Sequence, residues 1–106
     1  MDLEQIRIKV SNNEYDLSEH AHTERQAEHI TIKEIEKAIF SGEIIETYPK
    51  DLRGESVLIG VKLINRGLHV VCGTRSGRIL IVTVYEPKPP KWINYKTRSR
   101  PLKDRV

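Results

Sequence analysis

The segment LSEHAHTERQAEHI, residues 17–30, holds three of the four histidines of the 106-residue chain. If the segment is helical, His22, Arg25 and His29 share one side of the helix because they are three and four residues apart, whereas His20 points elsewhere. Histidine exchanges a proton near neutral pH, and the arginine fork binds a phosphate. These residue types suit RNA cleavage by 2′-hydroxyl attack, which needs a base, an acid and fixed cations around the phosphorus oxygens. A structural role, in which a histidine caps the helix or bonds to a sheet, is the alternative interpretation.

A metal site is not predicted from this segment. A helix binds a metal through residues four positions apart, but His20 and His22 diverge, and His22 and His29 lie two turns apart. The chain has one cysteine, Cys72, so no cysteine pair supplements the histidines. Cys72 is expected to be a small buried apolar residue of a central strand rather than a nucleophile. The sequence therefore predicts neither a metal nor any other cofactor.

Two further candidates for proton transfer lie on predicted strands. In the strand LHVVCG, alternation places His69 on the face opposite Leu68, Val70 and Cys72. Tyr85 ends the strand RILIVTVY, where the same alternation predicts that it shares a face with Ile79, Ile81 and Thr83. Tyr85 suits proton donation or base stacking, and an amphipathic position at the core edge is the alternative. Together with the helix, the sequence gives as candidate catalytic residues His20, His22, Arg25, His69 and Tyr85.

Basic residues gather at predicted hairpin ends and at the C-terminus. Residues 87–106 contain seven basic residues and one acidic residue, a formal charge of +6, so residues 1–86 carry −3. Trp92 and Tyr95 are interleaved with these cations, which suits phosphate neutralisation with base stacking, an acidic protein partner, or a solvated terminus. The candidate substrate-binding residues are Arg66, Arg75, Arg78, Lys91 and Trp92.

The elements that position these residues form an α+β pattern. A helix is expected from Ser18 to about residue 28, and a second helix from the capping box Thr31-x-x-Glu34 to Gly42. The stretch QIRIKV near the N-terminus predicts a short edge strand. Residues 43–48, 56–64, 68–74 and 78–85 read as four strands whose short links force antiparallel neighbours. We therefore expect two N-terminal helices on one face of a twisted antiparallel meander.

The length of the chain permits one hydrophobic core, which favours a single domain over residues 1–98 followed by a basic tail at residues 99–106. Three prolines, at positions 87, 89 and 90, are expected to end the sheet, and the chain beyond them to be either docked or mobile. No targeting pattern opens the chain and no apolar run approaches the roughly 20 residues that span a bilayer. These features, with the single cysteine, favour the cytoplasm and give no support for a membrane partner.

Five blocks resemble a small bacterial domain of unknown function over roughly residues 17–98: SEHAHTER, ITIKEIEKAI, SGEIIETYPKD, LHVVCG and IVTVYEPKPPKW. Members of that family are often predicted from their gene neighbourhood to pair with a YgiT-type zinc-finger antitoxin, and the family looks like a distant relative of the RelE and MqsR mRNA interferases. His20, His22 and Arg25 fall in its His-Ala and Arg motif, His69 in its His-Val-Val strand, and Tyr85 and Trp92 in its Val-Tyr-x-Pro and Trp block.

The resemblance implies a RelE/MqsR-like fold with helices on one face of the sheet. It also implies the toxin of a type II toxin–antitoxin pair, a metal-independent endoribonuclease with RNA as substrate and a protein antitoxin as partner. The alternative is a non-catalytic module that binds a protein partner or a single-stranded nucleic acid.

Overall fold

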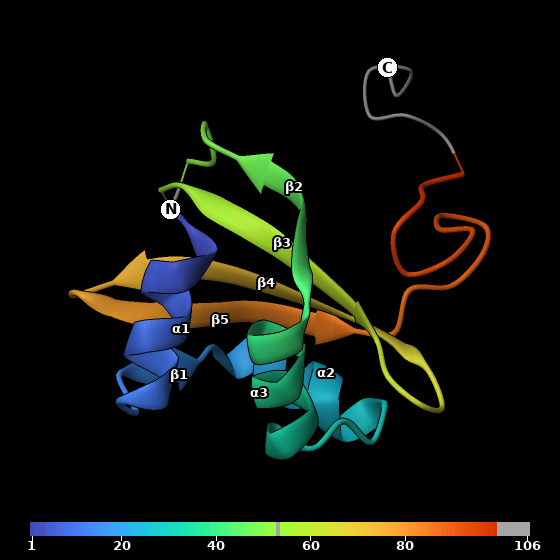
Figure 1. The fold of residues 1–106 in the computed structure, drawn as a ribbon, viewed down its shortest axis with the longest axis horizontal. Coiled ribbons are helices and arrows are strands. Elements are labelled where there is room, and N and C mark those ends of the chain that lie inside the picture. Colours follow the sequence, from blue (N-terminus) through green and yellow to red (C-terminus); the bar gives the residue numbers. More distant parts are fainter. Residues whose placement is uncertain (53, 100–106) are drawn as a thin grey trace.

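The computed structural model describes residues 1–52 and 54–99, so the predicted tail lies, apart from Ser99, outside the described residues. Within that part of the chain, three helices accompany a five-stranded sheet with the strand order β1-β5-β4-β3-β2 (Figure 1). The α+β class is confirmed, but the helices number three rather than two, and the sheet is mixed rather than purely antiparallel.

Four consecutive strands form the predicted meander: β2 (Glu43–Tyr48), β3 (Ser56–Lys62), β4 (Gly67–Arg75) and β5 (Arg78–Tyr85). Each pairs antiparallel with the next. Ser76 and Gly77, at φ values of 55° and 77°, form the two-residue turn between β4 and β5. The fifth strand, β1 (Tyr15–Leu17), pairs parallel with β5. Its three residues are too few to show an alternating pattern, so the sequence did not indicate it.

The N-terminal segment is a helix, α1 (Leu3–Ser11), and the predicted edge strand is wrong. Asp2 caps this helix by accepting a hydrogen bond from the backbone N–H of Gln5 at 2.8 Å. Ile6, Ile8 and Val10 fit an alternating pattern, but Ile6 and Val10 are buried at helical spacing while Ile8 is 53% exposed. The apolar residues therefore follow the helical period, which six residues alone do not reveal.

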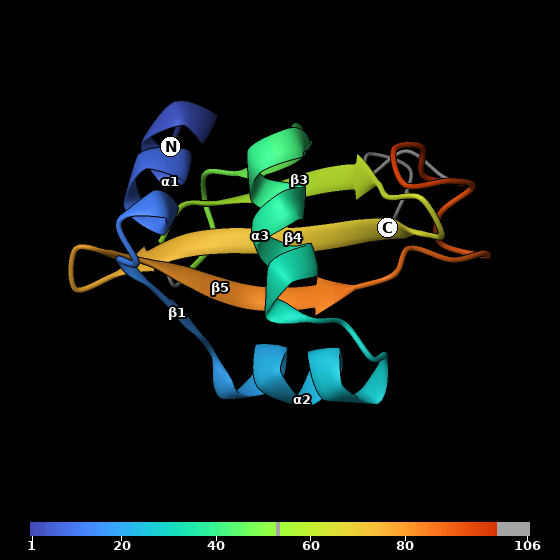
Figure 2. The ribbon, with the colours of Figure 1, turned by 60° about the horizontal axis from the view of Figure 1, so that its bottom comes forward.

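The other two helices are α2 (Glu19–Ala27) and α3 (Ile32–Ser41), with the predicted caps. Ser18 caps α2, and the capping box of Thr31 and Glu34 opens α3, which ends at Gly42. Figure 2 shows α1 and α3 on one face of the sheet and α2 beside β5. The expectation that α2 would pack on the same face is wrong. The N–H and hydroxyl of Ser18 donate to backbone carbonyls of β5 and fasten the start of α2 to that edge.

The core lies between the sheet and the two helices α1 and α3, and the opposite side of the sheet is here called the outer face. Isoleucines of α3, four residues apart, pack on buried residues of the central strands. A bulge in β5 at Val82 shifts its pairing with β4 by one residue. The residues of β5 that face the core are therefore Ile79 and Ile81 before the bulge and Val84 after it. Tyr85 consequently lies on the outer face beside His69, and its predicted place on the face of Ile81 is wrong.

Candidate functional site

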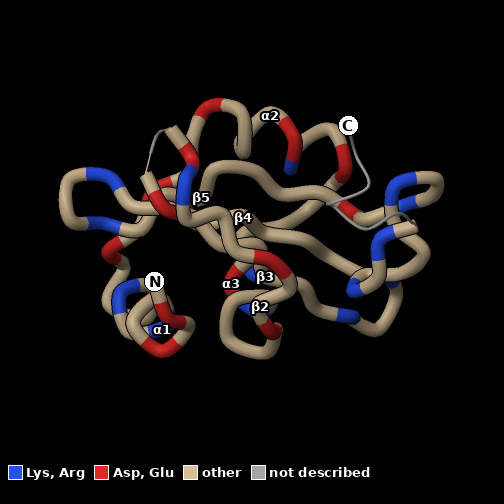
Figure 3. The backbone as a smooth tube through the Cα atoms, turned by 90° about the horizontal axis from the view of Figure 1, so that it is seen from above, with Lys and Arg blue, Asp and Glu red and all other residues tan. Residues whose placement is uncertain are grey.

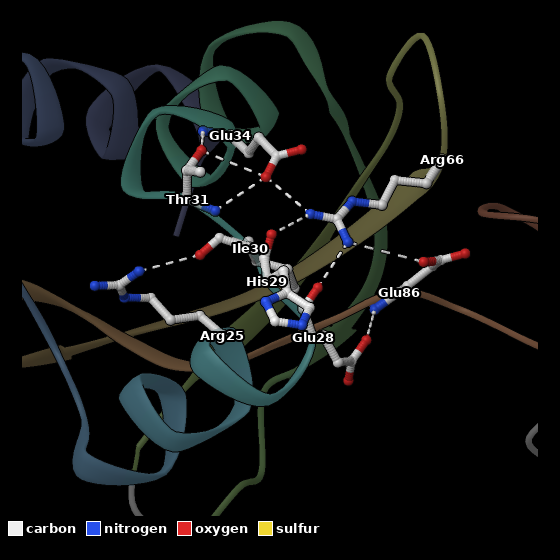
Figure 4. Close-up of polar contacts among 8 residues, drawn as sticks. All are labelled: Arg25, Glu28, His29, Ile30, Thr31, Glu34, Arg66 and Glu86. Carbon is white, nitrogen blue, oxygen red and sulfur yellow. Dashed lines mark hydrogen bonds and ion pairs between the residues drawn. The ribbon is translucent and has the colours of Figure 1, made fainter.

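Arg66 joins the connection between α2 and α3 to the sheet (Figure 4). Its guanidinium donates to the carbonyls of Glu28 and His29 and to the carboxylate of Glu34, each at 2.8 Å. Arg25 turns toward the same connection and donates to the carbonyl of Ile30 at 3.1 Å. Both guanidinium groups, which the sequence assigned to phosphate, therefore bind backbone oxygens of this connection.

Replacing Arg66 by glutamine is expected to lower the free energy of unfolding by about 2–3 kcal/mol. The carbonyls of Glu28 and His29 would lose charge-assisted hydrogen bonds, and Glu34 would lose its cation. Arg75→Gln is the matched control, because Arg75 is exposed and should change stability by less than about 0.5 kcal/mol. Urea unfolding measures both, and equal losses would contradict the role given to Arg66.

The histidines of α2 do not join the sheet residues. His22 is exposed, and the side chain of His20 is 64% exposed and lies 3.5 Å from Glu24. His20 and Arg75 instead line a separate hollow of about 300 Å³ over other parts of β4 and β5. Arg78 is bound by the carboxylate of Asp16 at 2.8 Å. Of the sequence-predicted residues, the structure brings together His69, Tyr85, Trp92 and Lys91.

His69 and Tyr85 form a hydrogen-bonded pair across β4 and β5. The Nδ1 atom of His69 lies 3.0 Å from the Tyr85 hydroxyl, and Nε2 is hydrogen-bonded to the backbone carbonyl of Tyr95. A carbonyl only accepts, so Nε2 carries the proton and Nδ1 accepts from Tyr85. The Trp92 ring meets the imidazole edge to face, with centroids 4.5 Å apart. His69 is completely buried and Trp92 is 1% exposed. The imidazole therefore lies beneath the C-terminal segment that carries Trp92.

That segment, residues 88–99, is here called the strap, and it is a docked loop rather than a free tail. The N–H of Ile93 donates to Thr97 at 2.8 Å, and Trp92 and Arg98 form an isolated antiparallel bridge. At the turn, the side-chain oxygen of Asn94 accepts from two successive N–H groups at 2.8 and 2.9 Å. The loop therefore holds its own shape and presents Trp92 to the sheet.

Arg98 fixes the strap to β2. Its guanidinium binds both carboxylate oxygens of Glu46, at 2.5 and 3.0 Å, and lies 4.6 Å from the centre of the Trp92 ring. Tyr48, two residues along β2, donates its hydroxyl hydrogen to Glu46 at 2.6 Å. The side chains of Arg98 and Glu46 are only 12% and 13% exposed, so water screens this ion pair weakly.

Burial sets the protonation states at the site. It lowers the pKa of His69 by disfavouring the imidazolium, and it raises the pKa of Tyr85 by disfavouring the phenolate. For Glu46, burial works toward a higher pKa, but hydrogen bonds from Arg98 and Tyr48 outweigh it and the pKa of Glu46 is lowered. At neutral pH the site therefore holds a neutral imidazole, a phenol and a carboxylate. By contrast, burial raises the pKa of Cys72 to about 12, which suits the inert role expected of it.

Charge is distributed unevenly around the molecule (Figure 3). Lysine and arginine gather at the end that carries the strap and also lie at the hairpin between β4 and β5, at the opposite end, whereas acidic residues lie along α2. The strap has four basic residues and no acidic one. An anionic ligand is therefore attracted more to the strap than to the histidine-bearing helix that the sequence singled out.

Sequence reasoning missed three members of the site: Glu46, Tyr48 and Arg98. The alternation of EIIETY places Glu46 and Tyr48 on one face of a strand, which was the signal available for them. Arg98 gave no such signal, because it was one cation among several in a basic tail. The assembled site offers an imidazole and a phenol for proton transfer beside cations that neutralise an anion.

A protein-family model matches residues 17–86 of the chain. The chain belongs to the DUF4258 family. This family is described as a domain of unknown function, so membership assigns no activity. No curated protein matched the chain, and no solved structure matched it. The DUF4258 match includes His69, Tyr85 and Glu46, whereas the strap lies beyond its C-terminal limit.

Residues 1–52 and 54–99 contain no group of three or more histidine, cysteine, aspartate or glutamate side chains arranged to hold a metal ion. In the same part of the chain, no helix combines the length and apolar character needed to cross a membrane.

Proposed function

We propose that the protein is a metal-independent endoribonuclease that cleaves mRNA in the cytoplasm and serves as the toxin of a type II toxin–antitoxin pair. The observation that carries the proposal is the His69–Tyr85 pair on the outer face, at the cationic end of the molecule. A neutral imidazole bonded to a phenol supplies a base and an acid without a metal.

In the proposed RNA complex, the imidazole of His69 is in the other neutral tautomer, which donates Nδ1–H to the Tyr85 oxygen and leaves Nε2 unprotonated. Nε2 takes the proton of an RNA 2′-hydroxyl, and the 2′-oxygen attacks the adjacent phosphorus. The bond from phosphorus to the 5′-oxygen breaks as that oxygen takes the Tyr85 proton, and Tyr85 recovers a proton from His69 Nδ1. The products are a 2′,3′-cyclic phosphate and a 5′-hydroxyl. The lowered pKa of His69 supports this assignment, because it keeps the imidazole unprotonated and able to act as a base at neutral pH.

The strap supplies the charge that such a reaction needs. Lys91 and Arg98 belong to the strap, and both charges act on the imidazole of His69. In the proposed complex they neutralise RNA phosphates while Trp92 stacks on a base. An acidic segment of a protein antitoxin, such as a YgiT-type zinc-finger protein, binds the same cations and so blocks the site.

Tyr85→Phe is expected to lower the rate of single-stranded RNA cleavage by about 100-fold, because it removes the proposed acid. The assay uses purified protein with a chelator present, and products are mapped by their cyclic phosphate and 5′-hydroxyl ends. Tyr15→Phe is the control, since Tyr15 is hydrogen-bonded to Glu36 and pairs with Ile79, at the opposite end of β5 from Tyr85, and this variant should cleave like the wild type. Soluble, folded wild-type protein that leaves RNA intact would refute the endoribonuclease.

A non-catalytic binding module is the second candidate, favoured by the complete burial of His69 and the use of both its nitrogens within the protein. Such a module keeps its affinity for a partner when His69 or Tyr85 is replaced and loses it when the strap is removed. An enzyme shows the reverse, with lost turnover and retained RNA affinity.

A further inference from the structure

The strap lies where a substrate would have to lie. The one ring nitrogen of His69 that does not face Tyr85 is hydrogen-bonded to the backbone carbonyl of Tyr95. That carbonyl oxygen stands in for an oxygen of an RNA strand approaching Nε2. Arg98, the cation nearest the Trp92 ring, is likewise held by the Glu46 carboxylate, which stands in for a phosphate.

We propose that the strap is an autoinhibitory cover over His69 and Tyr85, and that single-stranded RNA displaces it. This inference rests on the proposed function and names the regulation of that site. RNA phosphates replace Glu46 at Arg98, and the RNA takes the position of the Tyr95 carbonyl at His69. Because the strap carries four cations and no acid, it gains partners on the RNA as it leaves the sheet.

Two glycines show that the sheet is shaped to receive the strap. A Cβ atom added at Gly67, on β4, would lie 2.8 Å from the Cβ atom of Tyr95, closer than such atoms approach. A Cβ atom added at Gly60, on β3, would lie 2.8 Å from the Ile45 side chain and 3.1 Å from the Tyr95 carbonyl oxygen. Neither glycine has a positive φ, so a close neighbour is what excludes a side chain: Tyr95 at Gly67, and Ile45 together with Tyr95 at Gly60.

This geometry provides a variant that disturbs the cover and leaves every proposed reacting group in place. Gly67→Ala pushes Tyr95 off the sheet. Gly73→Ala is the matched control on the same strand, because its added Cβ has no neighbour nearer than 3.6 Å and makes ordinary contacts. Both variants keep His69, Tyr85 and all strap cations.

The test is titration with a 2′-O-methyl RNA oligonucleotide, which binds but lacks the attacking hydroxyl, while NMR follows the His69 Nε2–H proton that the Tyr95 carbonyl protects. We expect saturating oligonucleotide to remove this signal from the wild type, and Gly67→Ala to lack it without RNA. Gly67→Ala should also bind at least about tenfold more tightly than the wild type, because no cover has to be opened, and Gly73→Ala should match the wild type.

Three results would contradict the proposal that the strap covers the site: no binding of the oligonucleotide, binding with the His69 signal retained, or equal affinities of the two folded alanine variants. The titration of the wild type decides the matter even if Gly67→Ala fails to fold. Cleavage of ordinary RNA is scored separately. Displacement without cleavage supports the cover and refutes the endoribonuclease. Cleavage with the His69 signal retained throughout refutes the cover and the role of Nε2 as the base, but leaves the endoribonuclease standing.

Discussion

Replacing His69 by glutamine is expected to slow RNA cleavage by about 10²- to 10⁴-fold, the range typical for loss of a general base. Glutamine retains a side-chain N–H donor for the Tyr95 carbonyl, but it cannot take a proton from a 2′-hydroxyl. The loss should therefore appear in turnover, while affinity for a 2′-O-methyl oligonucleotide changes little. Single-turnover cleavage with labelled RNA, beside a binding titration, separates these two quantities.

His20→Gln provides the comparison that this result needs. His20 is the exposed histidine of α2 whose ring faces Glu24, and its sequence context made it as strong a catalytic candidate as His69. Its replacement should leave cleavage within about twofold of the wild type, since no contact of His20 reaches Tyr85 in the described structure. If His20→Gln lost activity and His69→Gln kept it, the site would belong to α2 instead of the outer face.

Much of the fold was readable because local signals and burial agree. The caps Ser18 and Thr31 and the terminating Gly42 stand where they were expected, since short-range hydrogen bonds determine where a helix begins and ends. The N-terminal helix was misread because Ile6, Ile8 and Val10 satisfy two periods at once, and only packing of the first and third on the core distinguishes them.

The candidate site was readable only in part, because long-range pairing creates it. Alternation placed His69 on the outer face correctly, but one bulge at Val82 moved Tyr85 to the same face, and no local pattern marks a bulge. The pairing of Arg98 with Glu46 joins residues 52 positions apart. Gly67 was an indirect signal of the docked strap, because Tyr95 passes too close to β4 there for a side chain. Glycine occurs in strands for several other reasons, so this position alone did not predict the strap.

The ion pair of Arg98 and Glu46 gives the second large effect. Removing the charge of Glu46 in Glu46→Gln leaves a guanidinium that is 12% exposed without its anion, and breaking such a buried pair costs about 3 kcal/mol or more. The other links of the strap to the sheet are the Tyr95 carbonyl at His69, the packing of Trp92 and the exposed ion pair of Lys96 and Glu43. None of them belongs to the core, so this cost is expected to release the strap before the core unfolds. In equilibrium terms, about 3 kcal/mol favours the open strap by roughly 100-fold relative to the wild type.

Trp92 reports this release directly, because it is the single tryptophan of the chain and is 1% exposed in the closed form. In Glu46→Gln its emission should shift to longer wavelength and become accessible to acrylamide, while the cooperative unfolding of the sheet in urea persists. Glu43→Gln is the matched control on the same strand. Its ion pair with Lys96, at 3.2 Å, joins side chains that are about half exposed, and its loss should change strap opening by less than about 1 kcal/mol. A buried Trp92 in folded Glu46→Gln would mean that the strap is held by the apolar contacts of Trp92 itself, and that an RNA phosphate gains nothing by competing for Arg98.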